Sequence, residues 1–134
     1  MKTIIAGARD IKDKLLVRQA IRDSGFEISL VVCGNAAGVD DLGKQHAYEN
    51  KLPLVIFPAN WEGEGKAAGP LRNQRMAEYA DACIIICKKD SRGSRDMAFR
   101  AAKHGLKLYV RVVEWDSSAQ LWLPAIKREF YDIK

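Results

Sequence analysis

One segment of the chain has the residue types of an anion site, because two arginines follow closely after a glycine and a proline. Its sequence is Gly69-Pro70-Leu71-Arg72-Asn73-Gln74-Arg75. Proline favours the first helical position and the glycine before it lets the backbone turn, so we expect a helix to begin near Leu71. Cations there oppose the helix dipole, whereas an anion is held by free N–H groups. The segment therefore predicts a bound anion. The residues expected around it are Lys66, Gly69, Arg72, Asn73 and Arg75.

The helical periodicity of this segment predicts where its polar side chains point. Arg72, Asn73, Met76 and Ala80 share one stripe of the helix. If Met76 and Ala80 face the core, Arg72 and Asn73 lie at the mouth of a cleft.

A second expected helix start, Ser91-Arg92-Gly93-Ser94-Arg95-Asp96, repeats the same conflict between arginines and the helix dipole. Its structural alternative is a simple cap, with Ser94 at the N-cap and Asp96 compensating the dipole. Two cationic helix starts together favour a phosphate-bearing ligand. Its expected contacts here are Arg92, Gly93 and Ser94.

Two further small-residue turns follow expected strands. Gly34-Asn35-Ala36-Ala37-Gly38-Val39-Asp40 brings backbone N–H groups close together, as phosphate-binding loops do, but completes neither a dinucleotide fingerprint nor a Walker loop. A tight connection and a ligand loop remain equally supported by its spacing. Candidate ligand contacts in this turn and in the one after the first strand are Gly7, Arg9, Gly34, Asn35 and Gly38.

Three carboxylates in these turns, Asp10, Asp40 and Asp96, are candidates for general-base work or for stabilising an oxocarbenium ion. Trp61 lies in a loop at the same rim, where it could stack on a base or pack against the protein. The three cysteines lack a histidine at metal-ligand spacing, so we expect buried thiols, no metal and no cofactor.

Unbroken apolar runs alternate with amphipathic segments along the chain. The expected strands are 2–6, 30–33, 53–57, 82–87 and 108–113. This pattern predicts a single α/β, Rossmann-like domain over residues 1–134: a mostly parallel five-stranded sheet with helices on both faces. Ligands of such sheets bind at the carboxyl ends of the strands, where all these turns converge. Residues 114–134 are expected to form a C-terminal helical tail, with a helix from about Ser118 to Phe130.

Composition limits the classes of partner. No apolar run approaches the roughly 20 residues that span a bilayer, and the N-terminus lacks a signal-peptide profile, so we expect a cytoplasmic protein without a membrane partner. The net charge of +5 is compatible with nucleic acid, but the cations of the two helix starts favour a local anion pocket. Apolar residues of the tail, such as Trp115 and Leu121, suit internal packing or a dimer interface.

Four motifs resemble the YspA-like (cpYpsA-related) branch of the SLOG superfamily, from about Met1 to Val112. They are Gly7-Ala8-Arg9-Asp10, Gly34-x-Ala36-x-Gly38-x-Asp40, Lys66 through Met76, and Gly93-Ser94-x-Asp96-Met97. The resemblance implies a Rossmann-like fold with a pocket for a nucleotide-derived ligand. It also implies a homodimer, and relatives in bacteria and phages. By this resemblance the chain is related to the DNA-processing protein DprA and to the LOG-type cytokinin-activating phosphoribohydrolases.

One departure bears on activity. The LOG signature is Pro-Gly-Gly-x-Gly-Thr-x-x-Glu, and its glutamate position is Met97 in this chain. Asp96 is displaced by one residue, which is about 100° on a helix, so phosphoribohydrolase activity does not transfer by resemblance. Three functions stay open: ligand binding for sensing or sequestration, hydrolysis of an N-glycosidic bond, and DprA-like binding of nucleic acid.

Overall fold

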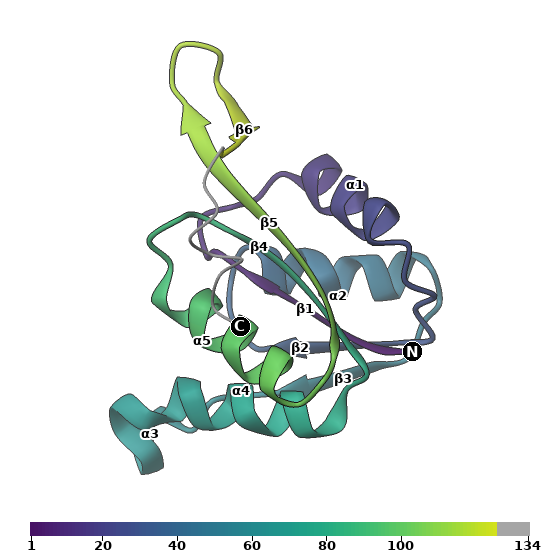
Figure 1. Ribbon diagram of the computed structural model, residues 1–134, viewed down its shortest axis with the longest axis vertical. Coiled ribbons are helices and arrows are strands. Elements are labelled where there is room, and N and C mark those ends of the chain that lie inside the picture. Colours follow the sequence, from purple (N-terminus) through teal and green to yellow (C-terminus); the bar gives the residue numbers. More distant parts are fainter. Residues whose placement is uncertain (126–134) are drawn as a thin grey trace.

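The computed structural model describes residues 1–125, along which strands and helices alternate (Figure 1). The elements are β1 (Lys2–Gly7), α1 (Lys14–Ser24), β2 (Leu30–Gly34), α2 (Val39–Glu49), β3 (Leu54–Phe57), α3 (Trp61–Glu64), a 3₁₀ turn η1 (Gly65–Ala67), α4 (Ala68–Tyr79), β4 (Ala82–Cys87), α5 (Arg92–Lys103), β5 (Lys107–Asp116) and β6 (Leu121–Pro124). The five expected strands are present, and β6 is an addition to them.

The strands form one sheet in the order β3-β2-β1-β4-β5-β6. The pairs from β3 to β5 are parallel, and β6 pairs antiparallel with β5. The sheet is thus mostly parallel, as the sequence predicts. The chain builds outward from β1 to β3 and then restarts on the other side of β1 with β4. This reversal places the topological switch point between β1 and β4, where ligands of open α/β sheets bind.

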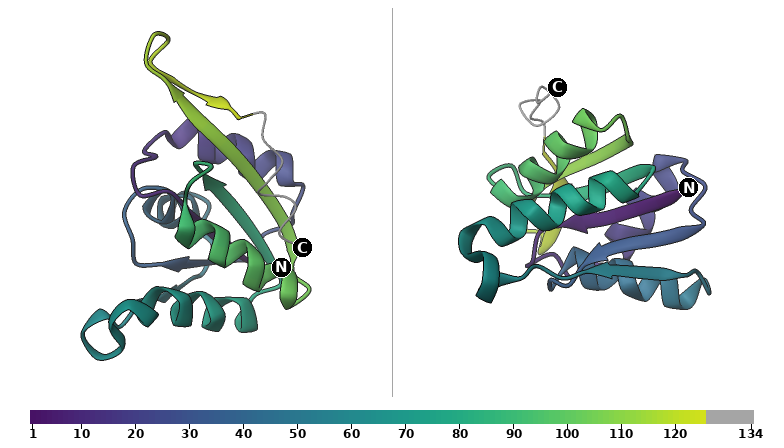
Figure 2. Two further views of the ribbon diagram at one scale, coloured as in Figure 1. Left: turned by 60° about the vertical axis from the view of Figure 1, so that its left-hand side comes forward. Right: turned by 90° about the horizontal axis from the view of Figure 1, so that it is seen from below.

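Helices cover both faces of the sheet (Figure 2). Along β4, Cys83 and Ile85 belong to the core beneath α4 and α5, whereas Ile84 and Ile86 belong to the core beneath α1 and α2. Every residue of β4 is buried, which explains its unbroken apolar run.

The predicted helical tail is wrong for its described part. Residues 107–116 and 121–124 form an antiparallel hairpin that projects beyond the helices (Figure 1, Figure 2). Trp115 and Trp122 stand opposite each other and contact edge to face, with ring centroids 5.2 Å apart. In the turn, the Asp116 carboxylate accepts from the backbone N–H groups of Ser118 and Ala119. Cross-strand aromatic packing and this turn outweigh the helical periodicity. The rest of the expected helix, residues 126–134, lies outside the described residues.

Within residues 1–125, none of the helices has the length and apolar character that crossing a bilayer requires.

Candidate functional site

A cleft of about 560 Å³ lies at the switch point, between the end of β1 and the starts of α4 and α5. Its volume is in the range of about 300 to 1,000 Å³ that small-molecule sites occupy. The lining residues are Ala6, Gly7, Ala8, Arg9, Ala36, Asp40, Trp61, Gly69, Pro70, Arg72, Asn73, Met76, Ser91, Arg92, Gly93, Ser94, Asp96 and Met97. The alanines, Pro70, Met76 and Met97 in this lining could not be identified as site residues from the sequence, because their side chains carry no charged or hydrogen-bonding group.

Helix α4 begins at Ala68, three residues before the expected start. Pro70 is tolerated in its first turn because the N–H groups there have no acceptor within the helix. Arg72 therefore lies in the second turn, where it opposes the helix dipole less than we expected. Arg75 does not line the cleft, and it donates to Glu64 with Nη2 and Oε2 2.8 Å apart. Lys66 is exposed in η1 and also lies outside the cleft.

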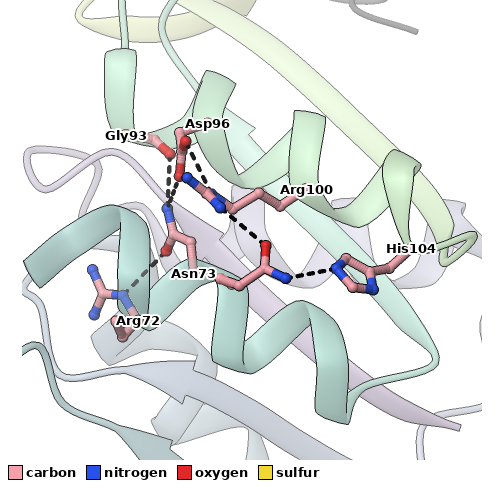
Figure 3. A network of polar contacts seen from close by, with 7 residues as sticks. Arg72, Asn73, Gly93, Asp96, Arg100 and His104 are labelled. Atoms are coloured by element: carbon pink, nitrogen blue, oxygen red, sulfur yellow. Dashed lines mark hydrogen bonds and ion pairs between the residues drawn. The ribbon is translucent and has the colours of Figure 1, made fainter. Parts of the chain in front are cut away.

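Asn73 is the buried polar side chain that connects α4 to α5 (Figure 3). Its Oδ1 accepts from Arg72 Nε at 3.1 Å. Its Nδ2 donates to Asp96 Oδ2 at 3.0 Å and to the Gly93 carbonyl oxygen at 3.4 Å. Donor and acceptor are both used, so the amide has a single orientation, and the guanidinium of Arg72 is held beside it at the cleft.

The Asp96 carboxylate accepts hydrogen bonds from both Asn73 and Arg100. Arg100 Nε donates to both of its oxygens, at 3.1 and 3.0 Å, and Arg100 Nη1 donates to Gln74 Oε1 at 2.9 Å. Gln74 Nε2 lies 2.8 Å from His104 Nε2 (Figure 3). With the amide oxygen of Gln74 occupied by Arg100, its NH₂ donates and His104 accepts. Asp96 thus lines the cleft with its carboxylate paired on both oxygens.

Asp40 is a buried carboxylate at the cleft, 5% exposed. Burial raises the pKa of Asp40, although Arg72 and hydrogen bonds from the backbone N–H groups of Ala36 and Gly7 lower it in part. Gly34 lies against both charged groups. A Cβ atom on Gly34 would stand 2.1 Å from Arg72 Nη1 and 2.7 Å from Asp40 Oδ2. A residue without a side chain is therefore required for this arrangement.

The turn from Gly34 to Gly38 is mainly a tight connection. Gly38 has φ of +73°, and a Cβ atom there would stand 2.3 Å from the Ala8 carbonyl oxygen. That oxygen accepts from Val39 N at 3.1 Å. Asn35 is exposed and accepts from Lys44. Neither glycine nor Asn35 lines the cleft, whereas Ala36 and Asp40 of this segment do.

Gly7 lines the cleft, but packing within the sheet already requires a glycine at this position. It pairs with Ile86 across β1 and β4, and a Cβ atom on it would stand 1.9 Å from the Ile86 carbonyl oxygen. Its absence of a side chain is thus explained by packing.

The start of α5 is the open part of the cleft wall. The side chain of its N-cap residue, Ser91, donates to Ser94 Oγ at 2.9 Å and does not cap the backbone. The first intrahelical bond is made by Arg95 N, so the preceding N–H groups have no acceptor within the helix. A Cβ atom on Gly93 would meet nothing within 4 Å. Free donors, the positive end of the helix dipole and open space coincide here.

The charges of the cleft are predominantly positive. Arg9 and Arg92 lie on its walls in exposed positions, and neither forms an ion pair within residues 1–125. Arg72 adds a third guanidinium. Of the two carboxylates, Asp96 is paired and Asp40 is buried. The cleft can therefore attract an anion.

Asp10 is separated from the other two candidate carboxylates. It lines a second cavity beside the hairpin, together with Lys88 and Trp115. Lys88 Nζ donates to Asp10 Oδ2 at 2.7 Å, and this hydrogen bond lowers the pKa of Asp10. No group of three or more His, Cys, Asp or Glu side chains in the described part of the chain is arranged to hold a metal ion.

Comparison with known proteins identifies the family. The model of the YspA, cpYpsA-related SLOG family matches residues 1–63. The Gene 61 protein of Mycobacterium phage D29 is 34% identical over 115 residues, which cover 78% of this chain and 91% of that protein. The chain belongs to the YspA, cpYpsA-related SLOG family. This confirms the family that the motifs resemble, and the matched residues 1–63 contain the first two of the four motifs. SLOG membership supports a nucleotide-related or nucleic-acid-related role in general terms.

The fold of this SLOG protein is similar to that of DNA processing protein A (DprA) from Streptococcus pneumoniae, with a TM-score of 0.66. The sequences are 19% identical, and the match covers 81% of this chain and 49% of that one. The SLOG chain thus spans about half the length of DprA, and the likeness concerns the fold.

Proposed function

We propose that this SLOG protein binds a nucleotide or nucleotide-derived ligand for sensing or sequestration, with the phosphate at the start of α5. The open space over Gly93, beside backbone N–H groups that have no acceptor within the helix, carries the proposal. Arg92 and Arg72 supply charge on two sides of the cleft. A phosphate oxygen would accept from both backbone and guanidinium donors, which is the pairing that phosphate sites use.

The test is a titration followed by NMR. Nucleoside monophosphates, ADP-ribose and cyclic nucleotides are added to the labelled protein, and the amide signals of Arg92, Gly93 and Ser94 are followed. We expect these amides to shift most, and Arg92→Ala to weaken binding at least several-fold. Arg18→Ala is the matched control, because Arg18 is an exposed arginine on α1 that pairs with Glu49. Equal loss in both variants, or no shift with any compound, would exclude the proposed site.

Hydrolysis of an N-glycosidic bond is the second candidate, favoured by the buried carboxylate of Asp40 in the cleft. In this reaction water adds to the anomeric carbon, the C–N bond breaks, and its electron pair leaves with the base nitrogen, which gains a proton. Asp40 would accept a proton from the water or stabilise positive charge on the ribose. Free base and ribose phosphate in the same NMR samples, lost in Asp40→Asn, would establish this activity.

DprA-like binding of nucleic acid is the third candidate, and the same samples distinguish it. It predicts that oligonucleotides bind with a steep salt dependence and that mononucleotides compete poorly. The cations Arg9, Arg72 and Arg92 gather around one cleft, which favours a small ligand.

We also propose a homodimer and a cytoplasmic location. The hairpin exposes Trp115, Leu121 and Leu123, and such an apolar surface suits a subunit interface. Cys33, Cys83 and Cys87 are free and buried, which fits a reducing compartment. Light scattering of the wild type and of Leu121→Asp tests the dimer. A wild-type monomer at tens of micromolar would contradict it.

A further inference from the structure

The cleft has one aromatic wall, formed by Trp61 at the start of α3. Trp61 is 52% exposed, although burying an aromatic side chain would stabilise the fold. It lies over the first turn of α4, where a Cβ atom on Gly69 would stand 3.4 Å from Trp61 Cη2. One part of the ring therefore rests on glycine while much of its surface faces solvent or the cleft.

The short segment that carries Trp61 is fixed on both sides of the ring. Asn60 Oδ1 accepts from Gly63 N at 3.1 Å, which caps α3. Glu64 accepts from Arg75 of α4 at 2.8 Å. Arg75 thus acts on the cleft indirectly, by anchoring the aromatic wall. A segment that is held in place before a ligand arrives loses little conformational entropy on binding.

We propose that Trp61 stacks on the nucleobase, so that the cleft selects nucleoside phosphates over sugar phosphates and inorganic phosphate. This inference rests on the proposed phosphate site at α5, because the ligand must carry an anion and a flat aromatic group together. Stacking of a base on an aromatic side chain contributes roughly fivefold to a hundredfold in affinity.

The neighbours of Trp61 also indicate how selective the stacking is. Gly69 and Pro70, which line the cleft beside the ring, have no side-chain donor or acceptor to read the edge of a base. Every base has an aromatic face, so we expect all four nucleoside monophosphates to bind, with purines tighter than pyrimidines because their face is larger.

Calorimetry with two probes tests the stacking separately from the phosphate site. AMP and ribose 5-phosphate share the anion and the sugar, and only AMP has a base. The wild type should bind AMP at least fivefold more tightly than ribose 5-phosphate. Trp61→Ala should bring the two affinities together without changing that of ribose 5-phosphate, and Trp61→Phe should retain most of the preference. Trp115→Ala is the matched control, since Trp115 is also about half exposed but does not line this cleft.

The outcomes separate the two proposals. If both probes bind and the AMP preference survives in Trp61→Ala, stacking is wrong and the phosphate site stands. If neither probe binds the wild type, the phosphate site fails and the stacking proposal fails with it. Circular dichroism of each variant verifies folding, and Trp61→Phe, which keeps an aromatic ring at this position, tests the stacking should the alanine variant unfold.

Discussion

The buried amide of Asn73 donates to the carboxylate of Asp96 across the interface of α4 and α5, with Nδ2 and Oδ2 3.0 Å apart. The same amide accepts from Arg72, so a single side chain both joins the two helices and orients a guanidinium at the cleft. The cationic wall and the open helix start are thereby held at a fixed separation.

Replacing this amide by a carboxylate should destabilise the protein. In Asn73→Asp the donor to Asp96 is lost, and a buried carboxylate at position 73 faces the partly buried carboxylate of Asp96. We expect the free energy of unfolding to fall by about 1 to 3 kcal/mol, the cost of an unsatisfied buried polar group, or by more. Urea unfolding measures it. Asn35→Asp is the control. The Asn35 side chain is exposed and accepts a hydrogen bond from Lys44, which a carboxylate can also accept, so the free energy of unfolding of this variant should equal that of the wild type.

Gly34→Ala should weaken ligand binding by displacing Arg72. The added methyl group would stand 2.1 Å from Arg72 Nη1, which lies at the end of a flexible side chain and can move away. A double-mutant cycle isolates this effect. In the Arg72→Ala background, Gly34→Ala should cause little further loss of affinity. Strictly additive losses would show that the two residues act independently.

Gly93→Ala should separate stability from binding. The added methyl group meets no protein atom within 4 Å, and alanine has a higher helix propensity than glycine. We expect unchanged or slightly raised stability in urea and weaker binding of nucleoside phosphates in calorimetry. Unchanged affinity would mean that no ligand approaches the start of α5.

Asp40→Asn should make the protein more stable at neutral pH. Because burial raises the pKa of Asp40 in the folded state above 3.8, the folded protein holds this proton more tightly than the unfolded chain. The contribution of Asp40 to stability therefore declines as pH rises from about 3.8 through the folded pKa, and is constant above it. The asparagine variant lacks this decline.

Urea unfolding at several pH values between 4 and 7 measures the difference between Asp40→Asn and the wild type. We expect it to be small at pH 4 and to grow in favour of the variant toward pH 7. Asp41→Asn, which removes an exposed carboxylate from the same helix, should not show this trend. A variant that is less stable than the wild type at pH 7 would show that the ionised form is the favoured one in the fold.

The sequence by itself determined the α/β class, the five parallel strands and the family. Buried parallel strands need apolar residues on both faces, so β4 is recognisable from its composition alone. The glycine-containing turns follow strands, and the carboxyl ends of parallel strands share one edge of the sheet. The stripe of Arg72, Asn73 and Met76 likewise follows from helical periodicity, which is a local property.

Only the tertiary structure decided which of these residues meet. The loop after β1 separates Asp10 from Asp40 and Asp96, because Arg9 lines the cleft with them whereas Asp10 lines the second cavity. Arg75 forms an ion pair with Glu64 and does not line the cleft. The contact between Trp115 and Trp122 stabilises a hairpin where helical periodicity predicts a helix. These outcomes depend on contacts between residues that are distant in the chain or on competition between local preferences. Each of these side chains could form a hydrogen bond, an ion pair or an apolar contact with several others, and the packing of the helices and strands determines which contact forms.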